Sequence, residues 1–129
     1  MESKSKSILI VDDSDDFRDI IATKLRSLGF EVTEAKDGKN GVLKAKEIKP
    51  DVILLDVSMP ILDGVGALLE IKKIAELKDV RCAFLTGYGD DHHPKSDHKV
   101  AGELGADLYI RKTDDLSEIV KKVNELFTS

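Results

Sequence analysis

The sequence predicts an α/β fold with a doubly wound, five-stranded parallel sheet in which a helix follows each strand. Four short runs are apolar throughout and rich in branched side chains, which is typical of strands that are covered on both faces. Segments with helical periodicity lie between these runs, and such alternation favours right-handed crossovers and helices on both sides of the sheet. A chain of 129 residues, 41% of them hydrophobic, can build one such core.

The predicted strands follow from the apolar runs, taken in order along the chain. The four runs are residues 8–11, 52–55, 83–85 and 108–110. A weaker segment, residues 31–34, alternates between polar and apolar side chains, so we expect it to form a strand at the edge of the sheet.

The predicted helices occupy the intervals between the strands. Apolar side chains share one helical face in residues 17–28, 42–48, 65–71 and 116–127. Gly29 supplies a stop for the first of these helices and Pro50 for the second. The interval after the fourth strand is weaker, because only residues 100–104 suggest a helix there.

Length, charge and composition limit the possible functions. We expect one domain over residues 1–129, with a core at about 7–127 and no room for a DNA-binding or enzymatic output domain. The formal net charge of −5 argues against direct binding of nucleic acid or membranes. Without an N-terminal secretory signal or an apolar segment of bilayer length, the chain is expected to be cytoplasmic. The lone Cys82 predicts a buried structural thiol.

Polar and charged side chains follow the predicted strands at the points where the strands end. Asp12 and Asp13 follow the first predicted strand, Asp56 the third, Thr86 the fourth and, one residue further on, Lys112 the fifth. In an open parallel sheet, ligands bind at the carboxyl ends of the strands. The sequence therefore predicts that three carboxylates, a hydroxyl and an ammonium meet at one edge.

These residue types together indicate phosphoryl chemistry beside a metal ion. Converging carboxylates repel one another and favour a hard cation such as Mg²⁺, which binds one or two carboxylates and often a phosphate. Lys112 and Thr86 would add a positive charge and a hydrogen-bond donor for phosphoryl oxygens. The sequence thus predicts phosphoryl transfer to a carboxylate.

The chain resembles the receiver domain of bacterial two-component response regulators from residue 8 to about residue 127. The segments that carry the resemblance are Ile-Val-Asp-Asp-Ser (10–14), Leu-Leu-Asp-Val-Ser-Met-Pro-Ile-Leu-Asp-Gly (54–64), Leu-Thr-Gly (85–87) and Gly-Ala-Asp-Leu-Tyr-Ile-Arg-Lys (105–112). The resemblance implies a flavodoxin-like strand order 2-1-3-4-5. It also implies a signalling switch in a two-component or phosphorelay system, rather than a turnover enzyme.

The resemblance assigns roles around the acceptor. Asp56 would take the phosphoryl group, and Mg²⁺ would be held by Asp13 directly, by Asp12 mainly through water and by the backbone carbonyl of Ser58. Lys112 would bind phosphoryl oxygens. The donor would be a sensor histidine kinase or a histidine phosphotransfer protein.

The resemblance also implies a switch. Thr86 would bind the phosphoryl group and shift inward, and Tyr109 would move with it. The surface around the fourth helix, fifth strand and fifth helix would then change for a downstream protein target.

Three other functions use the same fold. A phosphatase with Asp56 as nucleophile would need an acid two residues on, where Ser58 stands. A flavin or nucleotide carrier would need a phosphate-binding loop after the first strand, where residues 12–16 are mostly acidic. The alternative that stays open is a phosphorylation-independent interaction module with a vestigial site.

One segment departs from the family pattern. Residues 87–99 extend the loop before the fourth helix and contain His92, His93 and His98. Their spacing lacks the one-face pattern of a helical metal motif, so we expect solvated imidazoles rather than a transition-metal site. Thr113 stands where the family typically has proline.

Overall fold

The computed structural model describes residues 6–57, 63–87 and 106–128. Within these ranges, five parallel strands form one sheet in the order β2-β1-β3-β4-β5. The strands are β1 (Ser7–Val11), β2 (Glu31–Ala35), β3 (Val52–Asp56), β4 (Arg81–Thr86) and β5 (Leu108–Arg111). The predicted fold class and strand order are confirmed, and β2 lies at the expected edge.

Each strand is longer than its apolar run. Asp56 and Thr86 are the last residues of β3 and β4 instead of following them. The reason is that backbone hydrogen bonding continues beyond the apolar residues: the Val57 N–H donates to the Leu85 carbonyl over 3.1 Å, and the Lys112 N–H donates to the Thr86 carbonyl over 2.8 Å. Both side chains therefore have the fixed direction of strand residues.

The described helices are α1 (Asp15–Ser27), α2 (Gly38–Ile48), α3 (Gly64–Lys72) and α5 (Leu116–Thr128), with a 3₁₀ turn η1 (Ala75–Leu77) that the sequence did not predict. Helices α1, α2 and α3 begin before their apolar stripes because Ser14, Asp37 and Asp63 accept backbone N–H groups of the first turn. Helix α1 ends before Gly29, which has the positive φ of 97° expected at a helix stop. The predicted helix at 100–104 lies outside the described residues.

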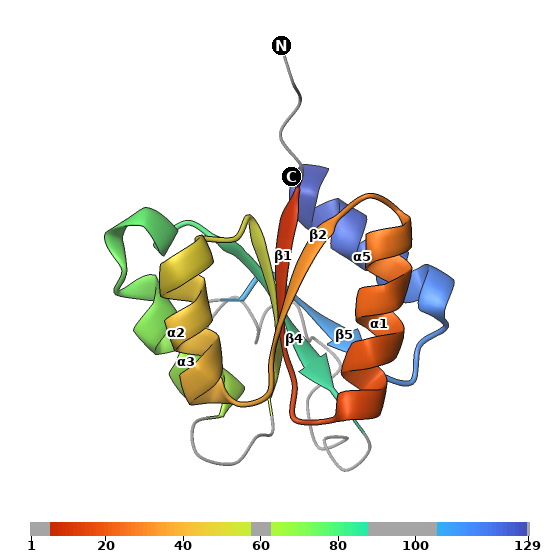
Figure 1. Cartoon of the computed structure of the whole chain (residues 1–129), viewed down its shortest axis with the longest axis horizontal. Coiled ribbons are helices and arrows are strands. Elements are labelled where there is room, and N and C mark those ends of the chain that lie inside the picture. Colours follow the sequence, from red (N-terminus) through yellow and green to blue (C-terminus); the bar gives the residue numbers. More distant parts are fainter. Residues whose placement is uncertain (1–5, 58–62, 88–105, 129) are drawn as a thin grey trace.

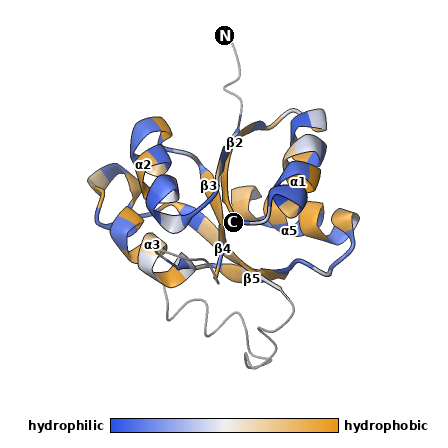
Figure 2. Cartoon of the chain, turned by 60° about the horizontal axis from the view of Figure 1, so that its bottom comes forward, coloured by the Kyte–Doolittle hydropathy of each residue, from blue (hydrophilic) through white to orange (hydrophobic). Residues whose placement is uncertain are grey.

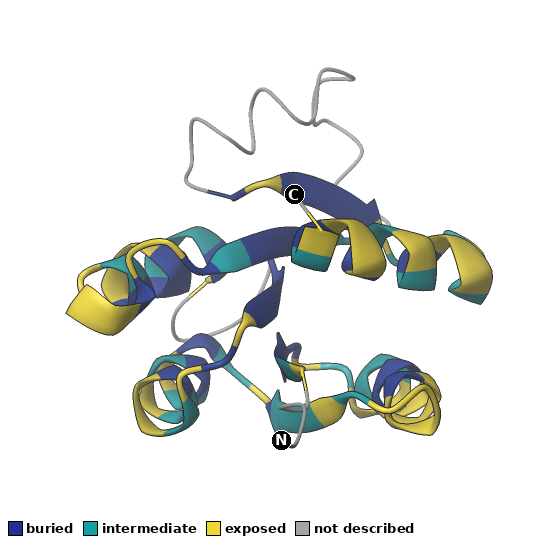
Figure 3. Cartoon of the chain, turned by 90° about the horizontal axis from the view of Figure 1, so that it is seen from above, coloured by how far each residue is buried: buried dark blue, intermediate teal, exposed yellow. Residues whose placement is uncertain are grey.

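The helices form two layers around the sheet (Figures 1 and 3). Helices α1 and α5 lie on one face, and α2 and α3 lie on the other. Consecutive strand residues alternate between these faces: Ile8 and Ile10 pack with α1 and α5, whereas Leu9 and Val11 pack with α2 and α3. The central strands β1 and β3 are largely apolar and buried, whereas the edge strand β2 alternates, and the helices show polar outer sides (Figure 2).

The thiol of Cys82 is fully buried in the α2–α3 layer, as predicted. Burial raises the pKa of this thiol, which keeps it protonated and unreactive at neutral pH. Among the helices that the structure describes, none combines the length and the apolar character needed to cross a membrane.

Gly41 allows α2 to approach β1 closely. A β-carbon at this position would lie 2.8 Å from both γ-carbons of Val11, well inside normal contact. Because Val11 ends β1 immediately before Asp12, this contact fixes the strand end from the α2 side.

We expect Gly41→Ala to destabilise the protein by about 1–2 kcal/mol, because overpacking outweighs the gain of about 1 kcal/mol from replacing a helical glycine. Denaturant unfolding of Gly41→Ala, Val11→Ala and the double variant measures this. In the Val11→Ala background, the added methyl should be neutral or stabilising. An unchanged cost in both backgrounds would contradict the steric explanation.

Candidate functional site

Three carboxylates and one ammonium meet where β1, β3 and β5 end. Oxygens of Asp12, Asp13 and Asp56 lie within 4.8 Å of one another. The Lys112 Nζ lies 2.7 Å from Asp12 Oδ2 and 3.2 Å from Asp56 Oδ2. The structure thus brings together four of the predicted site residues, from the ends of three strands of the sheet.

Each polar atom of Asp12 faces a partner in the structure. Its N–H donates to the Ala35 carbonyl over 3.0 Å, and its own carbonyl accepts a 2.7 Å hydrogen bond from Arg18 Nη1. Its Oδ1 accepts the Ser14 N–H over 2.8 Å, and Oδ2 faces Lys112. The residue has no exposed surface. Such a buried carboxylate is stable only because these groups compensate its charge.

Asp56 is 2% exposed at the end of β3. Gly64, the first residue of α3, packs directly on the backbone of this strand end. A β-carbon on Gly64 would overlap the Asp56 carbonyl oxygen and lie 2.9 Å from the Val57 α-carbon. Glycine is therefore required at position 64.

Lys112 connects the two buried acids. Its side chain is 18% exposed, and Nζ lies 5.1 Å from the centre of the Phe17 ring, a distance compatible with a cation–π contact. Burial by itself lowers the pKa of Lys112, but hydrogen bonding and attraction to Asp12 and Asp56 outweigh it, so the pKa is raised. The ammonium stays charged at neutral pH.

Thr86 and Tyr109 share the other face of the sheet. Alternation along β4 directs the Thr86 side chain to the same face as Phe84, which packs in the α2–α3 layer. Tyr109 is 4% exposed in that layer, and its ring centroid lies 5.7 Å from that of Phe84. Thr86 is partly exposed at the strand end.

Several predicted residues lie outside the described part of the chain. They are Ser58, whose carbonyl was expected to bind the metal, and His92, His93 and His98 of the extended segment. The expectations about them stay untested. Gly87 is described, and among the described residues a β-carbon there would meet Lys112 Cδ, at 3.7 Å.

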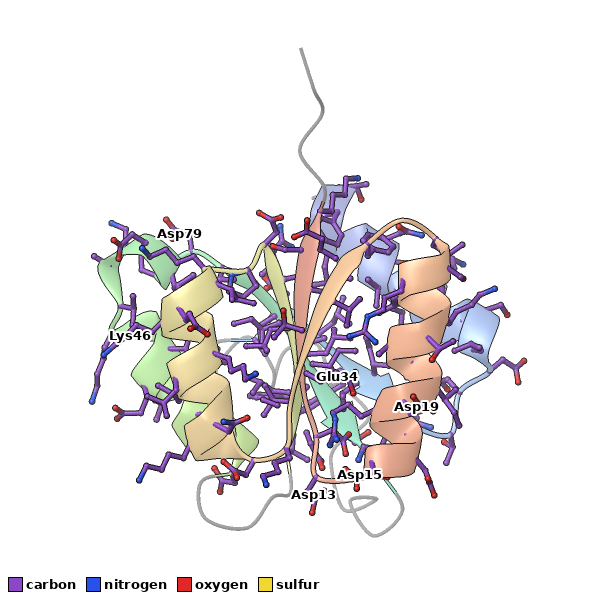
Figure 4. The ribbon with its side chains drawn as sticks, in the orientation of Figure 1. Asp13, Asp15, Asp19, Glu34, Lys46 and Asp79 are labelled. Atoms are coloured by element: carbon purple, nitrogen blue, oxygen red, sulfur yellow. The ribbon has the colours of Figure 1, made fainter. Side chains whose placement is uncertain are left out.

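The donor set fits a hard divalent cation. Carboxylate oxygens are the ligands that Mg²⁺ and Ca²⁺ prefer. Asp13 is exposed and adjoins two buried carboxylates (Figure 4 labels Asp13 at the end of β1), so an ion could keep water molecules on its outer side, as Mg²⁺ requires. Lys112 supplies one positive charge against these three acids, which leaves an excess of negative charge for a cation.

Arg18 is a residue of the site that the sequence analysis missed. Its guanidinium is bound to the Asp12 carbonyl, to Glu34 Oε1 at 3.0 Å and to Asp15 Oδ1 at 2.7 Å. The available signal was a basic residue near the start of α1, close to Asp12, Asp13, Asp15 and Asp16. Asp15, the first residue of α1, pairs with this arginine.

Comparison with known families agrees with this geometry. Residues 8–124 match the response regulator receiver domain. The chain belongs to this family. The receiver domain is a component of response regulators, which are signalling switches, and the predicted resemblance is confirmed.

Similar proteins include a regulator and two solved structures. The chain is 37% identical over 123 residues to the transcriptional regulatory protein PrrA of Mycobacterium leprae, covering 95% of this chain and 50% of that protein. A putative response regulator from Chloroflexus aurantiacus has a TM-score of 0.85 at 27% identity, covering 98% and 100% of the two chains. CheY in the CheX–CheY–BeF₃–Mg²⁺ complex of Borrelia burgdorferi has a TM-score of 0.83 at 28% identity, covering 96% and 90%.

The receiver domain described by this sequence spans about half the length of the curated relatives it matches.

We expect Lys112→Met to destabilise this receiver domain by about 2–3 kcal/mol in metal-free buffer, because removing one partner of a buried ion pair leaves the other uncompensated. The Asp12→Asn/Lys112→Met double variant should lose much less than the sum of the two single losses. Urea unfolding in the presence of a chelator measures all four proteins.

The matched control for Lys112→Met is Lys122→Met, which removes an ammonium paired with Asp114 at 3.2 Å in a more exposed position. Lys122→Met should lower the free energy of unfolding by less than about 1 kcal/mol. Equal losses for the two lysine variants would show that the Lys112 pair has no special weight.

Proposed function

We propose that this receiver domain accepts a phosphoryl group on Asp56 from a phosphohistidine of a sensor histidine kinase or histidine phosphotransfer protein. The observation that carries the proposal is the contact of Lys112 with both Asp12 and Asp56, whose carboxylate oxygens lie within 4.8 Å of an oxygen of Asp13. This arrangement offers a nucleophilic carboxylate beside a fixed positive charge and a set of metal ligands.

Asp56 would act as the nucleophile. One of its carboxylate oxygens forms a bond to phosphorus while the phosphorus–nitrogen bond of the donor breaks, and the electron pair of that bond stays on the histidine nitrogen. No proton has to be removed from Asp56, since the carboxylate is the reactive form. Most of the rate enhancement would come from positioning and from neutralising charge on the phosphoryl oxygens.

Asp12, Asp13 and Asp56 would hold Mg²⁺, together with the backbone carbonyl of Ser58. When bound, Mg²⁺ supplies positive charge to the transferring oxygens. Lys112 would turn from Asp12 towards the phosphoryl group and bind one oxygen, and Thr86 would donate a hydrogen bond to another. Support comes from the related Borrelia burgdorferi CheY structure, which contains Mg²⁺ and BeF₃.

Thr86 and Tyr109 would carry the signal away from the acceptor. The two side chains belong to neighbouring strands on one face, with Phe84 opposite Tyr109 in the β4–β5 register. A shift of Thr86 towards the phosphoryl group would open space that Tyr109 can enter. The surface formed by β5, α5 and the segment before β5 would then bind a downstream protein target.

The domain would be a switch without turnover of external substrates, although it would promote its own phosphorylation and dephosphorylation. In the whole protein the downstream event could be transcription, as the name of the Mycobacterium leprae relative indicates for that protein. We expect the receiver domain itself not to bind nucleic acid, because its net charge is −5.

Incubation of the protein with an acyl phosphate and Mg²⁺ should add the mass of one phosphoryl group, detectable by intact-protein mass spectrometry. Asp56→Asn should abolish labelling, because an amide oxygen is a poor nucleophile. Asp79→Asn, a matched change at the opposite end of the molecule (Figure 4), should be labelled like the wild type. Equal labelling of Asp56→Asn would disprove the proposal and favour the phosphorylation-independent interaction module.

Mg²⁺ binding can be tested separately by calorimetric titration. Asp13→Asn should weaken Mg²⁺ binding about tenfold or more, because it replaces an anionic ligand with a neutral one. Asp16→Asn removes the same charge from an exposed position in α1, where salt screens its effect, and should change the affinity less than about twofold. Equal effects of the two variants would argue against direct ligation by Asp13.

A further inference from the structure

Arg18 links the turn that carries the acids to the edge of the sheet. Its guanidinium uses three different nitrogens: Nη1 for the Asp12 carbonyl, Nε for Glu34 and Nη2 for Asp15. The Arg18 side chain is 14% exposed. The carboxylates of Asp15 and Glu34 compensate the loss of hydration of its charge. Figure 4 shows Glu34 on β2 beside α1, and Asp15 near Asp13.

We propose that Arg18 is a positioning residue for metal binding by this domain, acting through the main chain of Asp12. This inference rests on the proposed Mg²⁺ site. The Asp12 carbonyl belongs to the peptide group that leads into Asp13, so the 2.7 Å hydrogen bond from Arg18 restricts the rotation of that peptide. The direction of the exposed Asp13 side chain depends on the same rotation.

Among the described residues, Arg18 is the one that bonds to this carbonyl oxygen, while the hydrogen bond from the Ser14 N–H to Asp12 Oδ1 closes a turn that also spans the peptide. The Asp12 N–H bonds to β2, and the carboxylate oxygens face Ser14 and Lys112; these contacts fix the residue and its side chain. The carbonyl points towards α1, where Arg18 is the donor that reaches it. A planar guanidinium can hold three acceptors at fixed angles, which a lysine ammonium on a flexible stem does poorly.

Arg26 provides a matched control because it binds the same acid. Its Nη2 lies 3.2 Å from Glu34 Oε2 and donates to the Val32 carbonyl over 2.9 Å. It is the next arginine along α1, and its hydrogen-bond partners lie on β2, away from Asp12. Replacing Arg26 therefore removes the same charge and a contact to the same glutamate, but it leaves the Asp12 carbonyl bonded.

Replacing Arg18 should change Mg²⁺ affinity in opposite directions for a positioning role and for a purely electrostatic effect. Removing a positive charge near a cation site should by itself strengthen Mg²⁺ binding. Loss of positioning should weaken it, because the ligands must then be ordered when the ion binds. A purely structural contact would lower stability and leave the affinity unchanged.

The experiment is calorimetric Mg²⁺ titration of the wild type, Arg18→Gln, Arg18→Lys and Arg26→Gln, with amide hydrogen exchange at Asp13 and Ser14 in metal-free protein. We expect about tenfold weaker Mg²⁺ binding and faster exchange in Arg18→Gln, and nearly the same loss in Arg18→Lys, which keeps the charge. Arg26→Gln should bind Mg²⁺ like the wild type. Should Arg18→Gln not fold, Arg18→Lys carries the same expectation.

Unchanged or stronger Mg²⁺ binding by the Arg18 variants would overturn the inference, as would an equal loss in Arg26→Gln. In each of these cases the wild type still binds Mg²⁺, and the proposed phosphoacceptor function stands. Failure of the wild type itself to bind Mg²⁺ would instead remove the proposed metal site, and the role of Arg18 with it.

Discussion

The structure around the site depends on compensating buried negative charge at the end of a parallel sheet. Asp12 directly follows β1 and Asp56 ends β3, two strands that are buried on both faces, and each acid has almost no exposed surface. Lys112 faces both acids from a third strand, so the register of β1, β3 and β5 must be correct before the charges can meet. The ion pairs therefore favour the strand order that creates the site.

The alternation of strand side chains divides the site into two parts. Asp12, Asp56 and Lys112 continue the set of positions that packs against α1 and α5, whereas Thr86 continues the set that packs against α2 and α3. The charged groups thus gather on one side of the sheet edge, and the hydroxyl reaches the edge from the side that contains Tyr109. A ligand bound across the edge would contact both layers, which gives a physical route from the acids to the aromatic pair.

The sequence was sufficient to predict the elements that follow a regular hydrophobic pattern. It was less informative about features that depend on particular hydrogen bonds between distant residues. The four apolar runs and the alternating segment at residues 31–34 predicted the sheet, its edge and the meeting of Asp12, Asp13, Asp56 and Lys112, because parallel strands must end together. It did not predict η1, the strand ends or the capped first turns of the helices, since hydrogen bonding there does not follow hydrophobic periodicity. Arg18 was missed because its partners are a backbone carbonyl and a glutamate on another strand, neither of which leaves a local pattern.

The contrast between Asp12 and Lys112 indicates which part of the site can move. Asp12 is fixed through its N–H, its carbonyl and both carboxylate oxygens, so moving it would break contacts to β2, α1 and β5 together. Lys112 is anchored through its backbone to Thr86, while its long side chain shares one ammonium between two acids. A cation bound to the acids would reduce their attraction for that ammonium and leave it available to an anion. The acids are thus suited to hold a fixed geometry, and the lysine is suited to respond to what binds there.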